Sequence, residues 1–342
     1  MDENRKKRLL WQLPLLAILI VGTILIIRQQ QNIPYHHNTG IIFGTTYSVK
    51  YQSHTDLSQQ IADELQRVDL SLSPFNERSV ISAINNNRSF RTDSLFTSVF
   101  NLAMEVSQHT DGAFDITVAP LVNAWGFGFR DGIRPDARVI DSLRTIIGYQ
   151  RVRLAPDGSI VKDDPRIMLD CSAIAKGYGV DCVARLLAAN GVTNYMVEIG
   201  GEVITRGISP QRLPWRIGVT KPDDDTLAIH SEMQTVLNVT DLAMATSGNY
   251  RNFYYKGGKK YAHTVDPHTG YPVQHSLLSA TVLAADCATA DAYATAFMVM
   301  GMERARELLD KHPELMAYFI YSEPSGDMAV WYSPSLRDKI AE

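Results

Sequence analysis

Hydrophobic and polar positions alternate along this 342-residue chain in two different rhythms. Where apolar residues recur every three or four positions, one face of a helix is expected to be buried. Short apolar or alternating runs bounded by glycine, proline or asparagine predict strands instead. The predicted helices cover residues 57–70, 94–110, 172–190, 287–300 and 303–311. The predicted strands cover residues 41–51, 151–153, 160–162, 167–169, 195–199, 215–219, 234–239, 277–283, 317–321 and 328–332.

These elements interleave without a regular strand–helix–strand rhythm and without repeats, so we expect a mixed α+β fold and not a doubly wound sheet. The length allows one large or two modest domains with an ample core. The net charge of −4, with no basic stripe after residue 28, argues against nucleic acid as the main partner. Three widely spaced cysteines predict neither a zinc site nor a disulfide framework.

The N-terminal segment is expected to lie outside the folded domain. Residues 1–8 form a basic, cytoplasmic tail, and residues 9–27 form an apolar run that nearly matches a bilayer core of roughly 30 Å. A cleaved signal peptide is the alternative, but its apolar region is usually shorter and ends in a small-x-small site. We therefore predict an uncleaved transmembrane anchor, a polar linker over residues 28–40 and a single domain over residues 41–342, on the periplasmic side of the inner membrane.

Residues 170–179 place a carboxylate, small residues, a lysine and two glycines around the predicted start of a helix. Asp170, free backbone N–H groups and Lys176 could together surround a phosphate-bearing ligand. The alternative is an ordinary strand-to-helix junction with Asp170 or Ser172 as the N-cap.

Asp291 and Thr295 lie four residues apart on a strongly apolar predicted helix, so their oxygens share one face. A buried carboxylate is costly unless it is paired or binds a metal ion. One anionic and one hydroxyl oxygen suit Mg²⁺ better than zinc. In the alternative, Asp291 caps or forms a salt bridge and Thr295 bonds back to its own helix.

Turn residues hold His263 and Asp266 on a predicted rigid loop, where polar catalytic groups are often displayed. His263 could bind a pyrophosphate or move a proton, although a lone loop histidine more often does neither. Residues 245–251 resemble an anion-binding turn with Arg251 as its cation. Trp125 could stack on a flat heterocycle or belong to the core.

Taken together, these motifs resemble those of the ApbE family, the FAD:protein FMN transferases. The resemblance runs from about residue 43 to residue 302, and eight motifs in the same order are far more specific than any one of them. They lie at residues 43–45, 73–82, 123–126, 170–177, 200–202, 246–251, 263–270 and 290–295.

The resemblance implies an ApbE-type, T-fold-like mixed α/β domain that binds FAD and Mg²⁺, with Mn²⁺ as the alternative ion. The Ala173 carbonyl and the side chains of Asp291 and Thr295 would hold the metal. Phe43 stands where the family more often has methionine, and this replacement would keep an apolar contact. Phe75 stands where tyrosine is frequent, and this replacement would lose any hydrogen bond of the tyrosine hydroxyl. The implied FAD contacts are Phe43, Phe75, Ala124, Trp125, Gly126, Asp170, Lys176 and Val265.

The resemblance also implies the reaction. A threonine hydroxyl of a partner protein attacks the FMN-side phosphorus of FAD, AMP leaves, and FMN stays attached through a phosphoester. We expect His263 to be the base or a phosphate ligand and Asp266 to orient the loop. The implied acceptors are flavoprotein subunits of membrane redox complexes that carry a Ser/Thr-rich motif. The alternatives are an FAD pyrophosphatase, which uses water as the nucleophile, and a non-catalytic extracytoplasmic flavin carrier.

Overall fold

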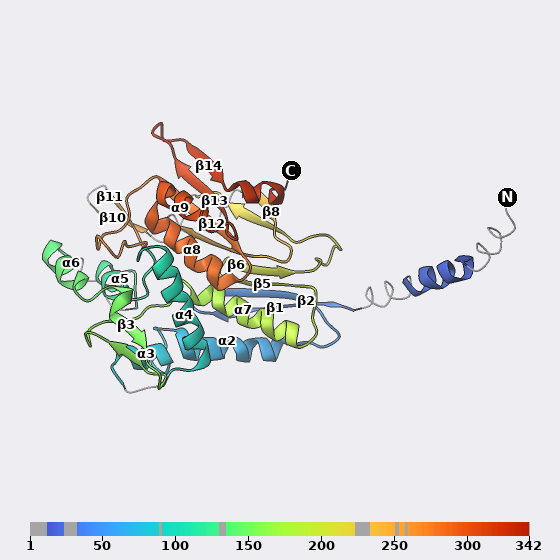
Figure 1. Ribbon diagram of the computed structural model, residues 1–342, viewed down its shortest axis with the longest axis horizontal. Helices are drawn as coiled ribbons and strands as arrows, with labels where there is room; N and C mark the ends of the chain where they lie inside the picture. Colours follow the sequence, from blue (N-terminus) through green and yellow to red (C-terminus); the bar gives the residue numbers. More distant parts are fainter. Residues whose placement is uncertain are drawn as a thin grey trace.

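A computed structural model describes residues 12–23, 33–88, 91–129, 135–222, 233–249, 253–256 and 259–341. Its centre is an eight-stranded sheet in which every neighbouring pair of strands is antiparallel. The order is β1-β2-β5-β6-β9-β12-β13-β14 (Figure 1). This sheet comprises β1 (Tyr35–Ile42), β2 (Thr45–Gln52), β5 (Tyr195–Ile199), β6 (Glu202–Arg206), β9 (Ala243–Gly248), β12 (Leu277–Ala284), β13 (Met316–Ser322) and β14 (Met328–Tyr332).

Three small hairpins accompany this sheet. They are formed by β3 (Val152–Leu154) with β4 (Ile160–Lys162), β7 (Arg216–Thr220) with β8 (Met233–Asn238), and β10 (Phe253–Lys256) with β11 (Lys259–Ala262). The antiparallel sheet confirms the prediction of a mixed fold that is not doubly wound.

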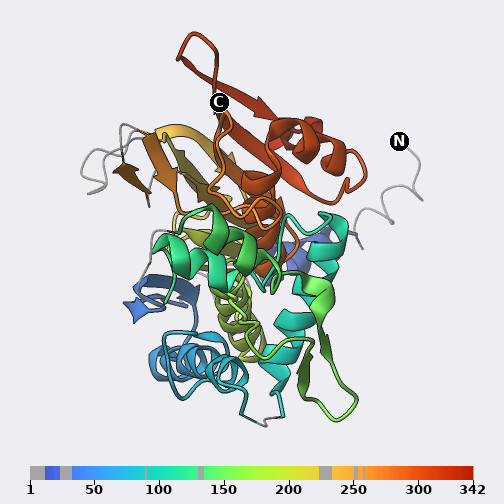
Figure 2. The same ribbon diagram turned by 90° about the vertical axis from the view of Figure 1, so that its left-hand side faces the viewer.

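The helices that follow β2 in the described chain cover one face of the sheet. Helix α7 packs on β5 and β6, helix α8 packs on β9 and β12, and α2 packs against α7. Figure 2 shows the short helices α5 and α6 at the end of the domain that faces the viewer. The helices are α2 (Ser58–Leu72), α3 (Val80–Asn85), α4 (Ser94–His109), α5 (Ala119–Trp125), α6 (Ala137–Arg144), α7 (Ala175–Ala189), α8 (Cys287–Met300) and α9 (Met302–Leu309), with 3-10 turns η1 (Tyr149–Arg151) and η2 (Pro334–Lys339).

The central strand β12 is buried on both faces. Ala280 and Val282 point into the main core beneath the helices, whereas Leu283 belongs to a second cluster with Leu237 of β8 and Leu336 of η2. Because successive side chains of a strand point to opposite faces, this division follows from the alternation of the strand. The site-bearing helices therefore rest on a sheet that is packed from both sides.

The start of the domain differs from the prediction. Residues 41–51 were expected to be one strand, but they contain the turn of the β1–β2 hairpin, in which Phe43 and Gly44 both have positive φ angles (52° and 72°). Strand β1 also takes residues 35–40 from the predicted linker 28–40. This strand is polar because it lies at the edge of the sheet, and its composition therefore resembles that of a linker.

Other elements that the sequence analysis did not predict are short, so each offers few positions in which a pattern can be recognised. They are the strands β6, β9, β10 and β11 and the helices α3, α5 and α6. Conversely, residues 167–169 lie in an extended segment that belongs to no strand. The long predicted helices and the remaining strands are confirmed, with shifts of a few residues at most at their ends.

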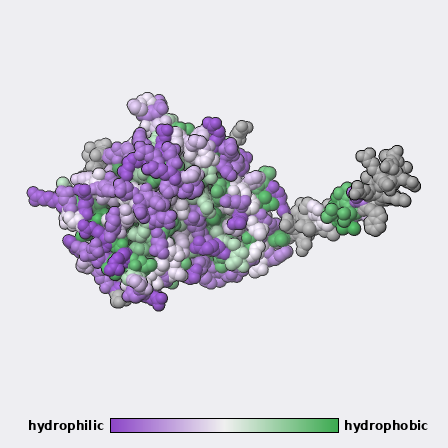
Figure 3. Space-filling model, in the orientation of Figure 1, coloured by the Kyte–Doolittle hydropathy of each residue, from purple (hydrophilic) through white to green (hydrophobic). Residues whose placement is uncertain are grey.

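Only part of the predicted membrane anchor lies within the described residues. Residues 12–23 are helical, and their side chains are mostly apolar, whereas the face of the domain seen in Figure 3 is largely hydrophilic. Among the described residues, no helix combines the length and the apolar character needed to cross a membrane. Residues 1–11 and 24–32, which complete the predicted tail, anchor and linker, lie outside the described part.

Helices α7 and α8 approach each other closely at Gly177. A Cβ atom added to Gly177 would lie 2.3 Å from the backbone oxygen of Cys287 and 2.9 Å from the Cα of Ala288. Real side chains cannot approach backbone atoms so closely, so only glycine fits this position. The crossing is visible in Figure 1, where α7 is yellow-green and α8 is orange.

We predict that Gly177→Ala destabilises the protein strongly, because two helix backbones must move apart. Overpacking a well-packed site costs about 1–3 kcal/mol, and a backbone collision belongs at the upper end or beyond. Gly179→Ala is the matched comparison, because its Cβ would meet the end of the Phe43 ring, which can shift. Denaturant unfolding should therefore rank Gly177→Ala as the less stable variant, and equal stabilities would contradict the close crossing.

Candidate functional site

The segment that leads into Asp170 is fixed by side-chain hydrogen bonds from α3. The Asn85 side chain pairs with the backbone of Leu169 in both directions, accepting its N–H at 2.7 Å and donating to its carbonyl at 2.9 Å. The Asp170 N–H donates to the carbonyl of Ile116 at 2.7 Å. These bonds satisfy backbone groups that would pair with a neighbouring strand in a sheet, and they fix the position of Asp170.

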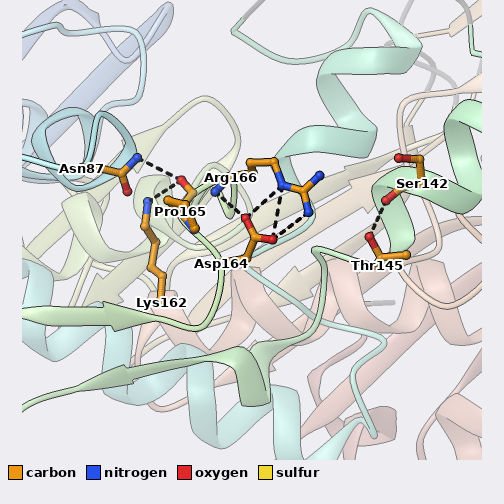
Figure 4. Close-up of polar contacts among 7 residues, drawn as sticks. All are labelled: Asn87, Ser142, Thr145, Lys162, Asp164, Pro165 and Arg166. Atoms are coloured by element: carbon orange, nitrogen blue, oxygen red, sulfur yellow. Dashed lines mark hydrogen bonds and ion pairs between the residues drawn. The ribbon is translucent and has the colours of Figure 1, made fainter.

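The preceding turn is also tied down. The carbonyl of Pro165 accepts hydrogen bonds from Asn87 and Lys162, at 2.9 and 3.4 Å (Figure 4). Beside it, the Arg166 guanidinium binds the Asp164 carboxylate through two nitrogens, with the shortest contact at 2.7 Å. The segment between β4 and Asp170 is therefore held in place by these hydrogen bonds and this ion pair.

Asp170 does not cap a helix. Its Oδ1 accepts hydrogen bonds from the backbone N–H and the hydroxyl of Ser172, at 2.8 and 2.6 Å, and so closes a local turn. Helix α7 begins only at Ala175, after Ile174 as the N-cap. The predicted N-cap alternative is therefore wrong for both Asp170 and Ser172. Burial raises the pKa of Asp170, although the bonds from Ser172 act to lower it.

Asp291 joins α8 to the first turn of α7. It is 3% exposed, and its Oδ2 accepts the backbone N–H of Gly177 at 3.0 Å. Burial raises the pKa of Asp291, although the Lys176 ammonium and the Gly177 N–H both act to lower it. Burial therefore outweighs the nearby positive charge of Lys176, and a bound cation would relieve the remaining cost of burying this carboxylate.

The first turn of α7 leaves the Ala173 carbonyl without a backbone partner. Ala173 precedes the N-cap, Ile174, and Gly177 is the third residue of α7, so its N–H is one of those that a helix leaves without an internal partner. This N–H donates to Asp291, and no backbone hydrogen bond reaches the Ala173 carbonyl within the described part of the chain. The Asp291 carboxylate and the Ala173 carbonyl are both hard oxygen donors of the kind Mg²⁺ prefers.

Thr295 lies one turn after Asp291 on α8. Its hydroxyl forms a hydrogen bond with the Ser247 hydroxyl of β9 at 3.0 Å, so it does not bond back to its own helix.

The capping alternative for Asp291 is partly correct, since Asp291 caps α7 from a neighbouring helix. Helix α8 itself is capped by Asp286, which accepts the N–H of Thr289 at 2.9 Å. The donors at Ala173, Asp291 and Thr295 are all oxygens, the type of ligand that magnesium takes in proteins.

Lys176 forms an ion pair that the sequence did not predict. Its ammonium lies 2.6 Å from Oε1 of Glu202, the first residue of β6. The pKa of Lys176 is raised, because the carboxylates of Asp291 and Glu202 outweigh the effect of burial, which acts to lower it. Burial raises the pKa of Glu202 to about 7, although Lys176 opposes this shift. Two carboxylates and one cation therefore share a buried space.

Asp181, a further buried acid missed by the sequence analysis, fixes α8 from α7. Its two carboxylate oxygens accept the N–H groups of Cys287 and Ala288 at 2.8 and 2.9 Å. These groups have no partner within α8, because they belong to its first turn. Asp181 therefore sets the position of α8 relative to α7, and with it the position of Asp291. The signal in the sequence was an acid on the apolar face of a predicted helix.

The loop of residues 263–272 packs against α5. The indole N–H of Trp125 donates to the carbonyl of Gly270 at 2.9 Å, and Val265 shares a buried cluster with Trp125. Trp125 is 8% exposed, so it acts as a core side chain under this loop. The His263 ring lies edge-on to the Phe127 ring, with centroids 6.5 Å apart. Ala124 is buried on α5, and Gly126 ends that helix with a φ angle of 83°.

Asp266 orders this loop from within. Its carboxylate accepts the N–H of His268 at 2.9 Å, and its backbone bonds to both Gly270 and Tyr271. An isolated bridge between Val265 and Pro272 closes the loop. The structure thus confirms that Asp266 lies in an ordered turn, while the roles predicted for His263 and Asp266 in catalysis stay predictions.

The remaining predicted residues lie apart from this cluster or outside the described chain. Phe43, at the β1–β2 turn, packs against Gly179 of α7. Phe75 is 69% exposed and lies edge-on to Phe129. The predicted anion-binding turn at residues 245–251 is wrong in its first part, because residues 245–248 end strand β9. Arg251 lies outside the described residues.

Comparisons with known proteins identify the family of this chain. A family model described as "ApbE family" matches residues 43–319. The FAD:protein FMN transferase of Vibrio cholerae serotype O1 is 37% identical over 293 residues, which cover 82% of this chain and 86% of that protein. The FAD:protein FMN transferase of Haemophilus influenzae is 35% identical and covers 84% and 87% of the two chains.

A solved structure titled "Flavin Transferase ApbE from Vibrio cholerae" superposes with a TM-score of 0.81 at 34% identity, covering 90% of this chain and 99% of that one. The ApbE protein of Thermotoga maritima superposes with a TM-score of 0.77 at 28% identity, over 90% of this chain and all of its own. The relatives named as transferases are enzymes, and so is this chain. It belongs to the ApbE family.

We predict that the stability difference between the wild type and Asp181→Asn depends on pH. Burial raises the pKa of Asp181 from 3.8 to about 7, although its two backbone hydrogen bonds oppose this. Between about pH 4 and pH 7 the folded wild type keeps a proton that the unfolded chain loses. Its free energy of unfolding therefore falls as the pH rises, by at most about 1.4 kcal/mol per pH unit from this group.

Asp181→Asn lacks this slope, but its amide nitrogen leaves a buried N–H without an acceptor, at a cost of about 1–3 kcal/mol. Denaturant unfolding at pH 4.5 and 7 measures both effects. Parallel pH profiles for the two proteins would show that Asp181 does not carry this proton.

Proposed function

We propose that this enzyme transfers FMN from FAD to a threonine hydroxyl of a target protein and releases AMP, in a Mg²⁺-dependent reaction. The observation that carries the proposal is the junction of α7 and α8. There the Gly177 N–H donates to Asp291, and the Ala173 carbonyl accepts no backbone hydrogen bond within the described chain. The names of the relatives supply the substrate and the product.

Asp291, Thr295 and the Ala173 carbonyl would hold the ion, with Ser247 fixing the Thr295 hydroxyl at 3.0 Å. When bound, Mg²⁺ neutralises charge on the diphosphate and on the phosphorus under attack. Mn²⁺ accepts similar oxygen ligands and would be expected to replace it. Asp170 and Lys176 flank this point at the start of α7 and would contact FAD.

Phe43, Phe75 and Val265 with residues 124–126 would form the remaining contacts to FAD. Trp125 supports this proposal indirectly, because its bond to Gly270 locks α5 to the loop of residues 263–272. FAD bound against α5 and this loop would contact residues that are already ordered, which lowers the entropic cost of binding.

In the chemical step, the threonine oxygen of the target forms a bond to the FMN-side phosphorus, and the bond from that phosphorus to the bridging oxygen breaks. AMP carries away the bridging oxygen, and FMN remains on the target as a phosphoester. His263 would accept the threonine proton as the attack proceeds. Asp266 would hold the loop that presents His263, through its bonds to His268, Gly270 and Tyr271.

The targets we propose are flavoprotein subunits of membrane redox complexes with a Ser/Thr-rich motif. An anchor over residues 9–27 would keep the domain on the periplasmic side, near such subunits. An FAD pyrophosphatase would use the same residues with water in place of threonine. A non-catalytic flavin carrier would bind FAD but release it unchanged.

We predict that the purified full chain labels a motif-bearing acceptor with flavin when FAD and Mg²⁺ are supplied. In-gel flavin fluorescence measures the label, and chromatography measures AMP. Free FMN and AMP without a labelled band would favour the pyrophosphatase, and unchanged FAD would favour the carrier. An acceptor in which the target threonine is replaced by valine is the control.

We predict that Asp291→Asn lowers the transfer rate at least about 100-fold. Removal of even the outer partners of metal ligands costs about 10–100-fold, and Asp291 supplies the charge itself. Chelation of the wild type should abolish labelling, and added Mg²⁺ should restore it. A variant that still labels the acceptor at the wild-type rate would exclude Asp291 as a metal ligand.

We predict that His263→Ala lowers kcat by about 100-fold or more while FAD still binds, as expected for loss of a general base. His54→Ala is the control, since it removes an exposed histidine of the connection between β2 and α2, outside this loop, and it should act like the wild type. Full activity of His263→Ala across the pH range would contradict the assignment.

A further inference from the structure

Glu202 occupies an unusual position for a carboxylate. It is 2% exposed and begins β6, directly after Gly200 and Gly201, which both have positive φ angles (62° and 104°). A Cβ on Gly200 would lie 2.8 Å from the Thr45 side chain, so the tight turn itself depends on glycine. This turn directs the Glu202 side chain inward, where an acid is costly to bury.

Only one oxygen of this carboxylate has a partner. Oε1 pairs with the Lys176 ammonium at 2.6 Å, whereas Oε2 is buried and has no hydrogen bond within the described chain. A buried ion pair that is incompletely satisfied generally contributes little or nothing to stability. Glu202 therefore requires an explanation other than its contribution to the fold.

The charges around Glu202 suggest an explanation for its burial. Lys176 is attracted by two carboxylates, those of Asp291 and Glu202, but the ion pair it forms is the one with Glu202. Within the described chain, Asp291 accepts only the Gly177 N–H, through Oδ2. If Lys176 moved to Asp291, its positive charge would occupy the place that a divalent cation needs, because like charges repel strongly in a buried site.

We propose that Glu202 is a positioning residue that holds Lys176 away from Asp291 and so keeps the Asp291 carboxylate available for a divalent cation. This inference rests on the metal site of the proposed function. Glu202 touches neither the ion nor FAD in this role, and it acts through Lys176. The Lys176 side chain is 31% exposed, whereas that of its partner Glu202 is 3% exposed, so the buried carboxylate holds a cation that is only partly covered.

The test measures Mn²⁺ binding to the full chain by electron paramagnetic resonance, with and without FAD, in the wild type and three variants. Glu202→Gln should weaken Mn²⁺ binding at least about tenfold, because Lys176 is then free to pair with Asp291. Lys176→Met should bind Mn²⁺ at least as tightly as the wild type. The double variant, Glu202→Gln with Lys176→Met, should recover most of the wild-type affinity, because no cation is left to compete.

Glu198→Gln is the matched control. Glu198 lies on β5 in the same hairpin, and its carboxylate accepts the Gly201 N–H at 2.7 Å, a bond that glutamine can keep. This variant loses one negative charge of the hairpin, yet Mn²⁺ affinity should stay within about twofold of the wild type. Thermal unfolding of every variant shows whether it is folded.

The outcomes separate the explanations. Recovery in the double variant supports the positioning role. A double variant that binds as weakly as Glu202→Gln would overturn it and indicate that Glu202 attracts the ion directly. Unchanged Mn²⁺ affinity in Glu202→Gln would also overturn it while leaving the metal site intact. A wild type that binds no Mn²⁺ would overturn the metal site of the proposed function and this inference together.

Discussion

The hydrogen bond from the Gly177 N–H to the Asp291 carboxylate connects the two halves of the candidate site. It exists only because α7 and α8 approach each other at a residue without a side chain. The same bond fixes the direction of Asp291, and the Ala173 carbonyl just before α7 accepts no backbone hydrogen bond within the described chain. Asp181 of α7 strengthens the contact between the two helices, because its carboxylate accepts the first N–H groups of α8. The close crossing of α7 and α8 thus fixes the position of the Asp291 carboxylate, the group to which a cation would bind.

Around this junction, the sheet acts as a rigid support. Helix α8 rests on β9 and β12, and its Thr295 is held by Ser247 at the end of β9. Helix α7 rests on β5 and β6, and its Lys176 is held by Glu202 at the start of β6. Each helix therefore has a polar contact with a strand beneath it. Residues on packed helices and strands hold a site more accurately than residues on loops, since their rotamers are fixed by neighbours.

The sequence predicted those parts of the molecule that depend on local pattern. Helices α2 and α4 bury apolar residues at helical spacing, and α8 is a long run that is apolar on nearly every side, so all three are clear from the sequence. Asp291 and Thr295 were found because both lie on one such helix. The pair of Lys176 and Glu202 could not be found in this way, because it forms between a helix and a strand that the turn at Gly200 brings together. Strand β1 was taken for a linker because edge strands carry polar residues and resemble linkers in composition.

Strand β1 also fixes where the preceding part of the chain joins the domain. It is the outermost strand of the sheet and ends in the turn that carries Phe43, beside α7. At about 3.3 Å per residue, the entry point at Tyr35 lies about 25 Å along the strand from that turn. Whatever precedes residue 35 is thus attached at the opposite end of this strand from Phe43, so a substrate protein could approach the turn without meeting the point of attachment.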